Sequence, residues 1–477
     1  MPAPGEVRER DVVASTGAAA IITTTRRLLI TALSAFATAV IARQYGAERF
    51  GGYASALAAY GLFSAAGDLG FTLLLGRELA RDVAGRGRLM RATAQVQLAW
   101  CAALALVFVG LALLRDDPTQ RDTMLILAPA VILGGLTAYR TIFNVVFRIR
   151  EIAMVDVVVN VAAIAATVAL AAGGADLRII AAAVATGYIA NTLIAVYLAR
   201  RHIDDVRPVR ADRLRVIRAA APLGLASLLA SMYFVIDMAL VGYLVDGEQL
   251  GWYAGAVKLL SLLVAVPGLV MTVALPGLSM ARDNRDELAR FARRTAHWLA
   301  ATGLPACAAC AVFAHPIVQL LYGDGYEPAD RLVRILALAA ALSLVSNVLG
   351  TLQITLNLVR PQLIANGIAL TLNIVGNVIL VPKHGVESSA WLTVACETIV
   401  VASAVVVLAP RVNLVSVVAG TWRPAAAVAC ASAVGLALHG TTALAVPAAL
   451  IVLVGAAIAF DAWPHELRPS SISRQQV

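Results

Sequence analysis

Long apolar segments follow one another along almost the whole chain, separated by short polar connections. A helix needs about 20 predominantly apolar residues to cross the hydrocarbon core of a bilayer. The pattern predicts about fourteen such spans, at 18–42, 52–76, 92–114, 123–146, 152–173, 179–199, 219–245, 252–280, 295–321, 332–352, 361–381, 386–409, 422–438 and 442–460. The span at 422–438 has the weakest pattern. Pro267-Gly268 should break the span at 252–280, as either a hinge or a simple kink. The chain is therefore predicted to be an all-α polytopic membrane protein.

A short repeat divides this series of spans into halves. The block Gly46–Ala54 returns 200 positions later as Asp246–Ala254, with the same Glu, Gly, Tyr and Ala at four positions. Six spans between the blocks would make the halves parallel, with a cavity between them. The predicted division is a tail at 1–17, an N-lobe at 18–210, a C-lobe at 211–409, two extra spans within 410–460 and a tail at 461–477.

Composition agrees with a membrane location. Of the 477 residues, 60% are hydrophobic and 14% are charged, more apolar than one soluble core can bury. The five cysteines all lie in apolar segments, and Cys307-x-x-Cys310 lacks further ligands, so packing is expected rather than metal or redox chemistry. No cofactor or metal is expected.

The positive charges orient the protein. Of 38 Lys and Arg, 27 fall on the N-terminal side of the predicted spans, 8 on the opposite side and 3 inside spans. The positive-inside rule then predicts that both termini are cytoplasmic. The net charge of +9 follows this topology and does not indicate nucleic-acid binding. The densest basic segment, 200–218, is either an interfacial helix on anionic lipid or a docking site for a cytoplasmic partner enzyme.

Charges inside predicted spans are candidates for function, because each is costly in a membrane unless it is paired or faces water. With a rise of 1.5 Å per residue, Arg27 and Asp68 lie about 22 and 24 Å from the outer end of the first hairpin. Asp237 and Lys258 both lie about 10 Å from the outer end of the hairpin at 219–280. The matched heights predict two acid–base pairs, which either are structural salt bridges or line a cavity.

Two further charges complete the candidate set. Arg26 precedes Arg27 at the end of a polar run that begins at Thr23, which favours a wet vestibule over simple snorkelling to the interface. Glu397 lies in the middle of the span at 386–409 without an identified partner, so it is either neutral or paired across the cavity. Asp68, Asp237, Lys258 and Glu397 are ion-pair or coupling candidates.

Several motifs carry a family resemblance. The segment Ala42–Tyr53 (ARQYGAERFGGY), Gly67–Gly70 (GDLG) and Arg77–Ala80 (RELA) resemble the N-terminal signature of polysaccharide exporters, and Leu321–Tyr326 (LYGDGY) resembles their second half. These are Wzx-like oligosaccharide flippases of the multidrug/oligosaccharidyl-lipid/polysaccharide exporter superfamily. The resemblance implies two six-helix bundles in a V, with two extra C-terminal spans. It also implies transport of undecaprenyl- or decaprenyl-pyrophosphate-linked glycans across the inner (cytoplasmic) membrane, with glycan-assembly enzymes as partners.

Two classes of function follow. In a flippase, Arg26 and Arg27 would bind the lipid pyrophosphate in an inward-facing cavity, because the guanidinium fork pairs bidentately with phosphate, and Asp68 would orient Arg27. In a membrane glycosyltransferase or polymerase, a catalytic acid or base would sit on a sizeable outer loop. The outer connections here are short and carry no such cluster, so we expect a transporter without catalytic residues. A multidrug or cation antiporter of the same superfamily is the alternative, although its cavity should be richer in acids.

Overall fold

The computed structural model describes residues 4–81, 85–146, 148–203, 208–437 and 442–459, and within these ranges some helical side chains are not described. All regular structure in these ranges is helical. The chain divides into two compact units, one of Met1–Ala254 with Asn377–Val386 and one of Gly255–Gly376 with Glu387–Val477. The bounds of these units differ from those of the predicted lobes, which concern the arrangement in the membrane and stay a prediction.

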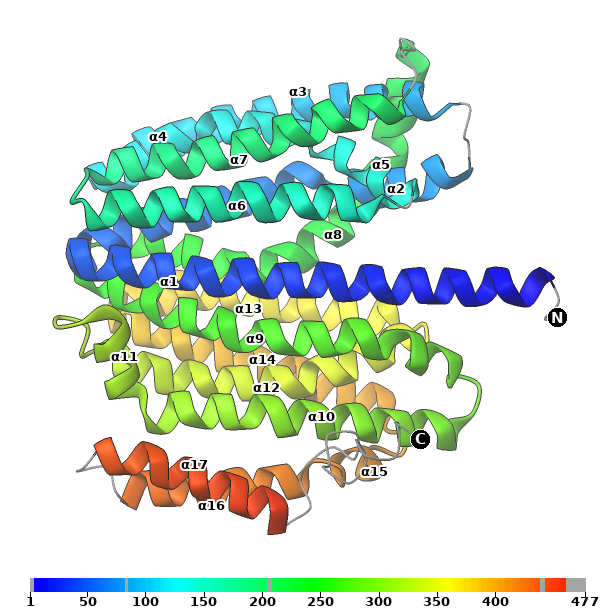
Figure 1. Cartoon of the computed structure of the whole chain (residues 1–477). Helices are drawn as coiled ribbons and strands as arrows, with labels where there is room; N and C mark the ends of the chain where they lie inside the picture. The colour runs from blue at the N-terminus through cyan, green and yellow to red at the C-terminus, as the bar shows by residue number, and fades with distance from the viewer. Residues whose placement is uncertain (1–3, 82–84, 147, 204–207, 438–441, 460–477) are drawn as a thin grey trace. The chain divides into compact units, whose positions relative to one another are not determined.

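Ten helical elements precede the segment shared by the two units (Figure 1). They are α1 (Pro4–Asp68), α2 (Phe71–Arg81), α3 (Arg86–Leu113), α4 (Pro118–Leu133), the 3-10 helix η1 (Gly134–Arg140), α5 (Thr141–Val145), α6 (Ile149–Ala172), α7 (Leu177–Ala199), the 3-10 helix η2 (Arg200–His202) and α8 (Arg210–Leu244). α1 contains the first predicted span and residues 52–68 of the second, and it begins inside the predicted tail. The two arms of α1 meet at Gly46, whose φ of 74° and ψ of 171° are open only to glycine.

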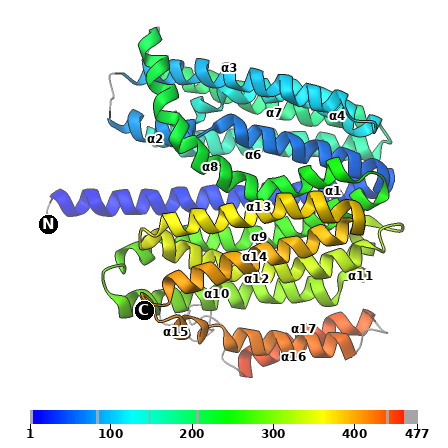
Figure 2. The same cartoon turned by 180° about the vertical axis from the view of Figure 1, so that it is seen from behind.

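Small residues allow the helices of the first unit to pack closely. Ala56 and Ala59 of α1, together with Phe108 of α3 and Met124 of α4, belong to one buried cluster. α1 also packs against α6 and α8, and α8 crosses from the side of α3 to α1 (Figure 2). At the other end of the unit, Leu79 of α2 and Phe143 of α5 belong to a second buried cluster.

The second unit is built around α10. Its helices, with the two that it shares with the first unit, are α9 (Glu248–Met280), α10 (Arg285–Val312), α11 (Ala314–Tyr322), α12 (Ala329–Thr355), α13 (Val359–His384), α14 (Val386–Leu408), α15 (Leu414–Val418), α16 (Trp422–Ala437) and α17 (Thr442–Ala459). α10 packs against α12, α15 and α16, and α16 packs against α17. The last two helices coincide closely with the extra spans predicted from the sequence.

Eight helices of the described part are long and apolar enough to cross a membrane, judged by length and composition. The protein is therefore an all-helical, multi-pass membrane protein. The predicted number of fourteen spans stays a prediction.

Several predicted spans are interrupted within their predicted bounds. The span at 52–76 ends at Asp68, and Leu69 and Gly70 have positive φ before α2 begins. The span at 123–146 changes to a 3-10 helix at Gly134, and the span at 295–321 is divided at Phe313. By contrast, α9 continues through Pro267-Gly268, so the helix is not interrupted there, and a hinge or kink at this position stays a prediction.

Candidate functional site

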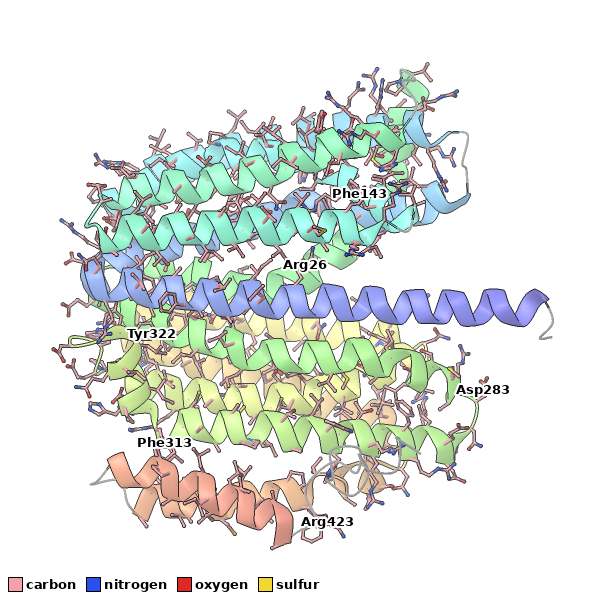
Figure 3. The ribbon with its side chains drawn as sticks, in the orientation of Figure 1. Arg26, Phe143, Asp283, Phe313, Tyr322 and Arg423 are labelled. Atoms are coloured by element: carbon pink, nitrogen blue, oxygen red, sulfur yellow. The ribbon has the colours of Figure 1, made fainter. Side chains whose placement is uncertain are left out.

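Two arginines meet one buried carboxylate in the first unit. Arg26 Nη1 of α1 donates to Asp156 Oδ2 of α6, and Arg140 Nη2 from the end of η1 donates to Asp156 Oδ1. Figure 3 shows Arg26 projecting from α1 toward α6. Asn191 of α7 links the two sides, because its amide nitrogen lies 3.1 Å from Asp156 Oδ1 and its oxygen accepts Arg140 Nη1 at 2.5 Å. We call Arg26, Arg140, Asp156 and Asn191 the arginine cluster.

The helices bring these residues to one depth. Arg140 lies 5 residues from Val145, Asp156 lies 7 from Ile149 and Asn191 lies 8 from Ala199. With a rise of 1.5 Å per residue, these positions are about 8, 10 and 12 Å inside the helix ends on the arginine-rich side. The arginine cluster is therefore well inside the helices, where an unpaired charge would be costly.

The charges in the arginine cluster do not balance. The Asp156 side chain is 8% exposed, whereas those of Arg26 and Arg140 are 25% and 29% exposed. Asp156 uses both carboxylate oxygens on the arginines, and its backbone carbonyl accepts Asn160 Nδ2 at 2.7 Å. Two partly exposed cations thus share one buried anion, and the cluster has a net charge of +1. Such an arrangement can attract an anion to the exposed guanidinium faces.

Of the predicted pair Arg27 and Asp68, only the side chain of Asp68 is described. Asp68 accepts from the backbone nitrogen of Thr72 at 3.2 Å and from its hydroxyl at 2.5 Å, which stabilises the first turn of α2. The side chain of Arg27 lies outside the described residues, so an Arg27–Asp68 pair stays a prediction. Arg26 is the member of the dipeptide whose partner is described, and that partner lies 130 residues away.

The other candidate residues also have described contacts. Asp237 accepts from the Tyr253 hydroxyl and, at 3.1 Å, from Asn377 Nδ2. Glu397 is buried and accepts from the Ser346 hydroxyl at 2.8 Å. The backbone carbonyl of Lys258 accepts the Ser261 hydroxyl. Pairing of Asp237 with Lys258 stays a prediction.

A third arginine, Arg115, has many more hydrogen-bond acceptors and lies at the opposite end of the first unit. Its Nε donates to Gln120 Oε1 at 2.6 Å, and its Nη2 donates to the Gly242 carbonyl at 2.8 Å and to Asp246 Oδ1 at 2.9 Å. Nη1 lies 3.4 Å from the Tyr243 carbonyl. Gly242 and Tyr243 are in the last turn of α8, whose carbonyls lack intrahelical partners. Arg115 therefore caps α8. We call Arg115 and its four partners, Gln120, Gly242, Tyr243 and Asp246, the Arg115 clamp.

The two repeat blocks touch each other beside the Arg115 clamp. A Cβ added to Gly51 would lie 2.6 Å from Gly251 N, and one added to Gly251 would lie 1.9 Å from Ala47 O. Both glycines are therefore needed for close approach of two backbones. The contact explains why this position is glycine in both blocks.

Sequence reasoning missed Arg140, Asp156 and Asn191. Arg140 was counted as part of a connection, and Asp156 is only 4 residues inside its predicted span, where a charge is easily read as interfacial. The polar side chains of three successive predicted spans at similar depth were the available signal. Asn191, in the span at 179–199, completes that set.

Comparison with solved structures defines the class of fold. The lipid II flippase MurJ in an inward closed conformation superposes with a TM-score of 0.74 at 14% identity, covering 92% of this chain and 99% of that chain. An inward-facing multidrug resistance MATE family transporter of the MOP superfamily gives a TM-score of 0.58 at 14% identity, covering 84% and 98%. The eukaryotic MATE transporter AtDTX14 gives 0.54 at 14% identity, covering 88% and 99%. The fold is thus that of these membrane transporters.

Comparison of sequences defines the family. The family model described as polysaccharide biosynthesis protein matches residues 40–331, which is more than half of the chain. The chain belongs to the polysaccharide biosynthesis protein family. No curated protein matches the sequence.

Proposed function

We propose that this protein is a flippase that moves polyprenyl-pyrophosphate-linked oligosaccharide from the cytoplasmic to the outer leaflet by alternating access. The observation that carries the proposal is the excess of positive charge in the arginine cluster, where Arg26 and Arg140 share Asp156. Membership in a polysaccharide biosynthesis family and a transporter fold support the glycan and the mode of action. No catalytic residue is required for this activity.

In the proposed mechanism, the exposed faces of Arg26 and Arg140 bind the pyrophosphate. A guanidinium donates two parallel N–H groups to phosphate oxygens, so two arginines from different helices can hold a diphosphate in a fixed orientation. Asp156 keeps both guanidinium groups in place and reduces the local charge, which weakens anion binding enough for release. Arg27 stays a further candidate contact, with Asp68 as its proposed orienting partner.

Lysine substitution tests this role because it keeps the charge and removes the planar fork. We expect Arg26→Lys with Arg140→Lys to reduce translocation of a labelled polyprenyl-pyrophosphate glycan in proteoliposomes by about tenfold or more. The matched control is Arg43→Lys, an exposed arginine on α1, which should transport normally. Wild-type transport by the double lysine variant at normal abundance would exclude the binding role.

A multidrug or cation antiporter remains the second candidate, because transporters of that class share the fold. The carboxylates that such a protein would use are the half-buried Asp237 and the buried Glu397. If purified protein moves a lipophilic cation against a proton or sodium gradient and does not move the lipid-linked glycan, the antiporter is correct and the flippase is not.

The distribution of basic residues supports an inner-membrane location with both termini in the cytoplasm. Arg88 and Asp116 are exposed near opposite ends of α3, whose 28 residues extend about 40 Å. In a variant with the exposed Cys430 replaced, Asp116→Cys should react with an impermeant thiol reagent from outside and Arg88→Cys should not. The opposite labelling would reverse the orientation.

A further inference from the structure

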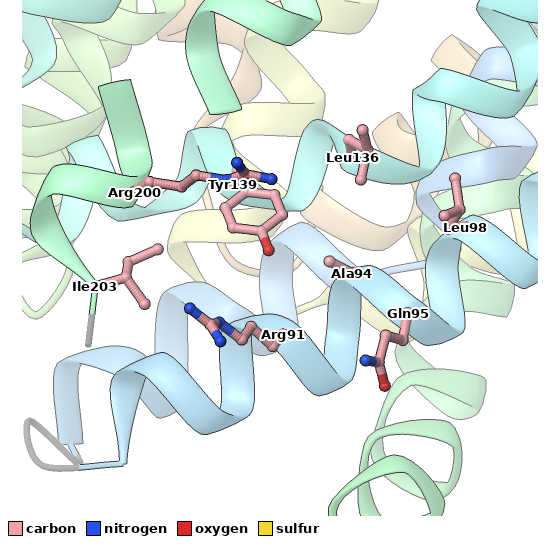
Figure 4. Close-up of a pocket in the computed structure, with 8 residues that line it drawn as sticks. All are labelled: Arg91, Ala94, Gln95, Leu98, Leu136, Tyr139, Arg200 and Ile203. Carbon is pink, nitrogen blue, oxygen red and sulfur yellow. The ribbon is translucent and has the colours of Figure 1, made fainter. Parts of the chain in front are cut away.

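A cavity of about 550 Å³ lies among α3, η1 and the segment that follows α7. The residues that line it are Arg91, Ala94, Gln95, Leu98, Leu136, Tyr139, Arg200 and Ile203 (Figure 4). No member of the arginine cluster is among these residues. The cavity is therefore distinct from the site proposed for the transported substrate.

We propose that this cavity binds the phosphate headgroup of an anionic phospholipid. Arg91 comes from α3, Tyr139 from η1 and Arg200 from η2, so three separate elements contribute donors. In Figure 4 the hydroxyl of Tyr139 points to the side where Arg91 lies, and the Arg200 guanidinium lies beside the Tyr139 ring. Two guanidinium groups and a phenol supply charge and directed N–H and O–H donors for a phosphate.

The lining changes from cationic to apolar along the helix. Arg91 is 5 residues into α3, about 8 Å from its start, whereas Leu98 is about 18 Å from it. Leu98 and Leu136 lie together, away from Arg91 and Arg200, in Figure 4. A phospholipid entering from this end presents the same order, with its phosphate near the helix ends and its acyl chains deeper. An inorganic phosphate would leave the apolar part of the cavity unfilled.

The charged residues that line the cavity, Arg91 and Arg200, are both basic. Arg213 Nη1 lies 3.5 Å from Gln95 Oε1 at the edge of the lining. Two acids described at this end of the unit contact arginines outside the lining: Glu78 accepts from Arg215 at 2.8 Å and Glu151 accepts from Arg148 at 2.6 Å. None of the described lining residues is acidic. Basic pockets between spans on the cytoplasmic side are a recurring form of lipid recognition.

The cavity also separates the two interpretations of the basic segment 200–218. A docking site for a partner enzyme needs a flat exposed surface, whereas Arg200, although exposed, lines a recess that continues into apolar side chains. The recess matches one lipid molecule better than it matches a flat protein surface. We therefore favour lipid binding, with the proposed site at Arg200, where this segment begins.

Lipid binding by matched variants tests the proposal. The cavity variant carries Arg91→Gln and Arg200→Gln; the control carries Arg88→Gln and Arg201→Gln, exposed neighbours on α3 and η2 that do not line the cavity. Both remove two positive charges from the same elements. Native mass spectrometry with phosphatidylglycerol should show about tenfold weaker retention by the cavity variant, equal to about 1.4 kcal/mol. The control should change less than about twofold, as expected of a screened surface charge.

Two further arms identify the source of the phosphate. Leu136→Trp, which fills the apolar end, should weaken phosphatidylglycerol binding and leave binding of inorganic phosphate unchanged. Phosphatidylcholine, which is zwitterionic, should bind the wild type more weakly than phosphatidylglycerol. The proposal fails if the control loses as much lipid as the cavity variant, or if inorganic phosphate binds as tightly as the lipid. Because binding is measured, the result does not depend on whether the protein transports a glycan.

Discussion

The arginine cluster and the Arg115 clamp place the same side chain in apolar surroundings, yet they differ in the ratio of donors to acceptors. Arg115 alone meets four oxygen acceptors, three of them from α8 and the turn after it, and its side chain is 11% exposed. Arg26 and Arg140 share one carboxylate and keep exposed faces of 25% and 29%. A saturated guanidinium holds helices together, whereas an undersaturated one can bind a ligand.

An Asp→Asn substitution in each site should give the largest difference in stability between the arginine cluster and the Arg115 clamp. Asp156→Asn leaves two guanidinium groups beside each other without their shared anion, and we expect a loss of about 3 kcal/mol in stability. Asp246 is 65% exposed, so Asp246→Asn should cost less than about 1 kcal/mol. Thermal unfolding in detergent measures both. Adding Arg140→Gln to Asp156→Asn should restore part of the loss, and equal Tm values for the two single variants would contradict the distinction.

The close contact beside the Arg115 clamp offers the next largest effect. Gly251→Ala would place a Cβ 1.9 Å from the Ala47 carbonyl oxygen, so the backbones must separate at a cost of about 1–3 kcal/mol. Gly76→Ala in α2 is the matched control, because nothing lies within 4 Å of its added Cβ. The control should be neutral or slightly stabilising, since alanine favours helix over glycine. A Gly251→Ala protein that melts like the control would show that the contact is loose.

Neutralising one arginine in each site should separate stability from transport. Arg115→Gln removes the cap of α8 and should lower stability by about 1–2 kcal/mol, with transport falling only as the amount of folded protein falls. Arg26→Gln should change stability less and reduce transport per folded molecule by about tenfold. Transport normalised to monodisperse protein distinguishes the two. If both variants lose transport equally after normalisation, the number of acceptors around an arginine does not distinguish a structural from a binding role.

Glu327 provides the smallest effect and a reference carboxylate outside both sites. It lies between α11 and α12, and its own backbone N–H and that of Gly325 hold its pKa below the usual value; Gly325 N lies 3.2 Å from Oε1. A depressed folded-state pKa gives stabilisation that is present above the unfolded pKa and is lost as pH falls through the folded value. The small Tm difference between wild type and Glu327→Gln should therefore disappear at acidic pH. A difference that grows with acid would have the wrong sign.

Apolar periodicity predicted the helical class, and the bounds of the last two helices nearly to the residue. It did not predict the interruptions at Leu69 and Phe313, because the segments on both sides of each break are apolar and together have the length of one span. Gly70 and Pro316 beside these breaks were the available signals. The comparison of residue depths in the sequence considered only pairs of helices that are adjacent along the chain. The partner of Arg26 lies on α6, four predicted spans away, and therefore escaped that method.

The paired glycines of the two repeat blocks have one further consequence. Gly51 and Gly251 meet through backbone atoms, so no rotamer freedom is lost when the surfaces join and none is regained when they part. If the two backbones separate during each transport cycle, the contact can re-form without any side chain having to adopt a particular rotamer. A joint of this kind is suited to rapid repetition, and the absence of a side chain at both positions would then serve kinetics as much as packing.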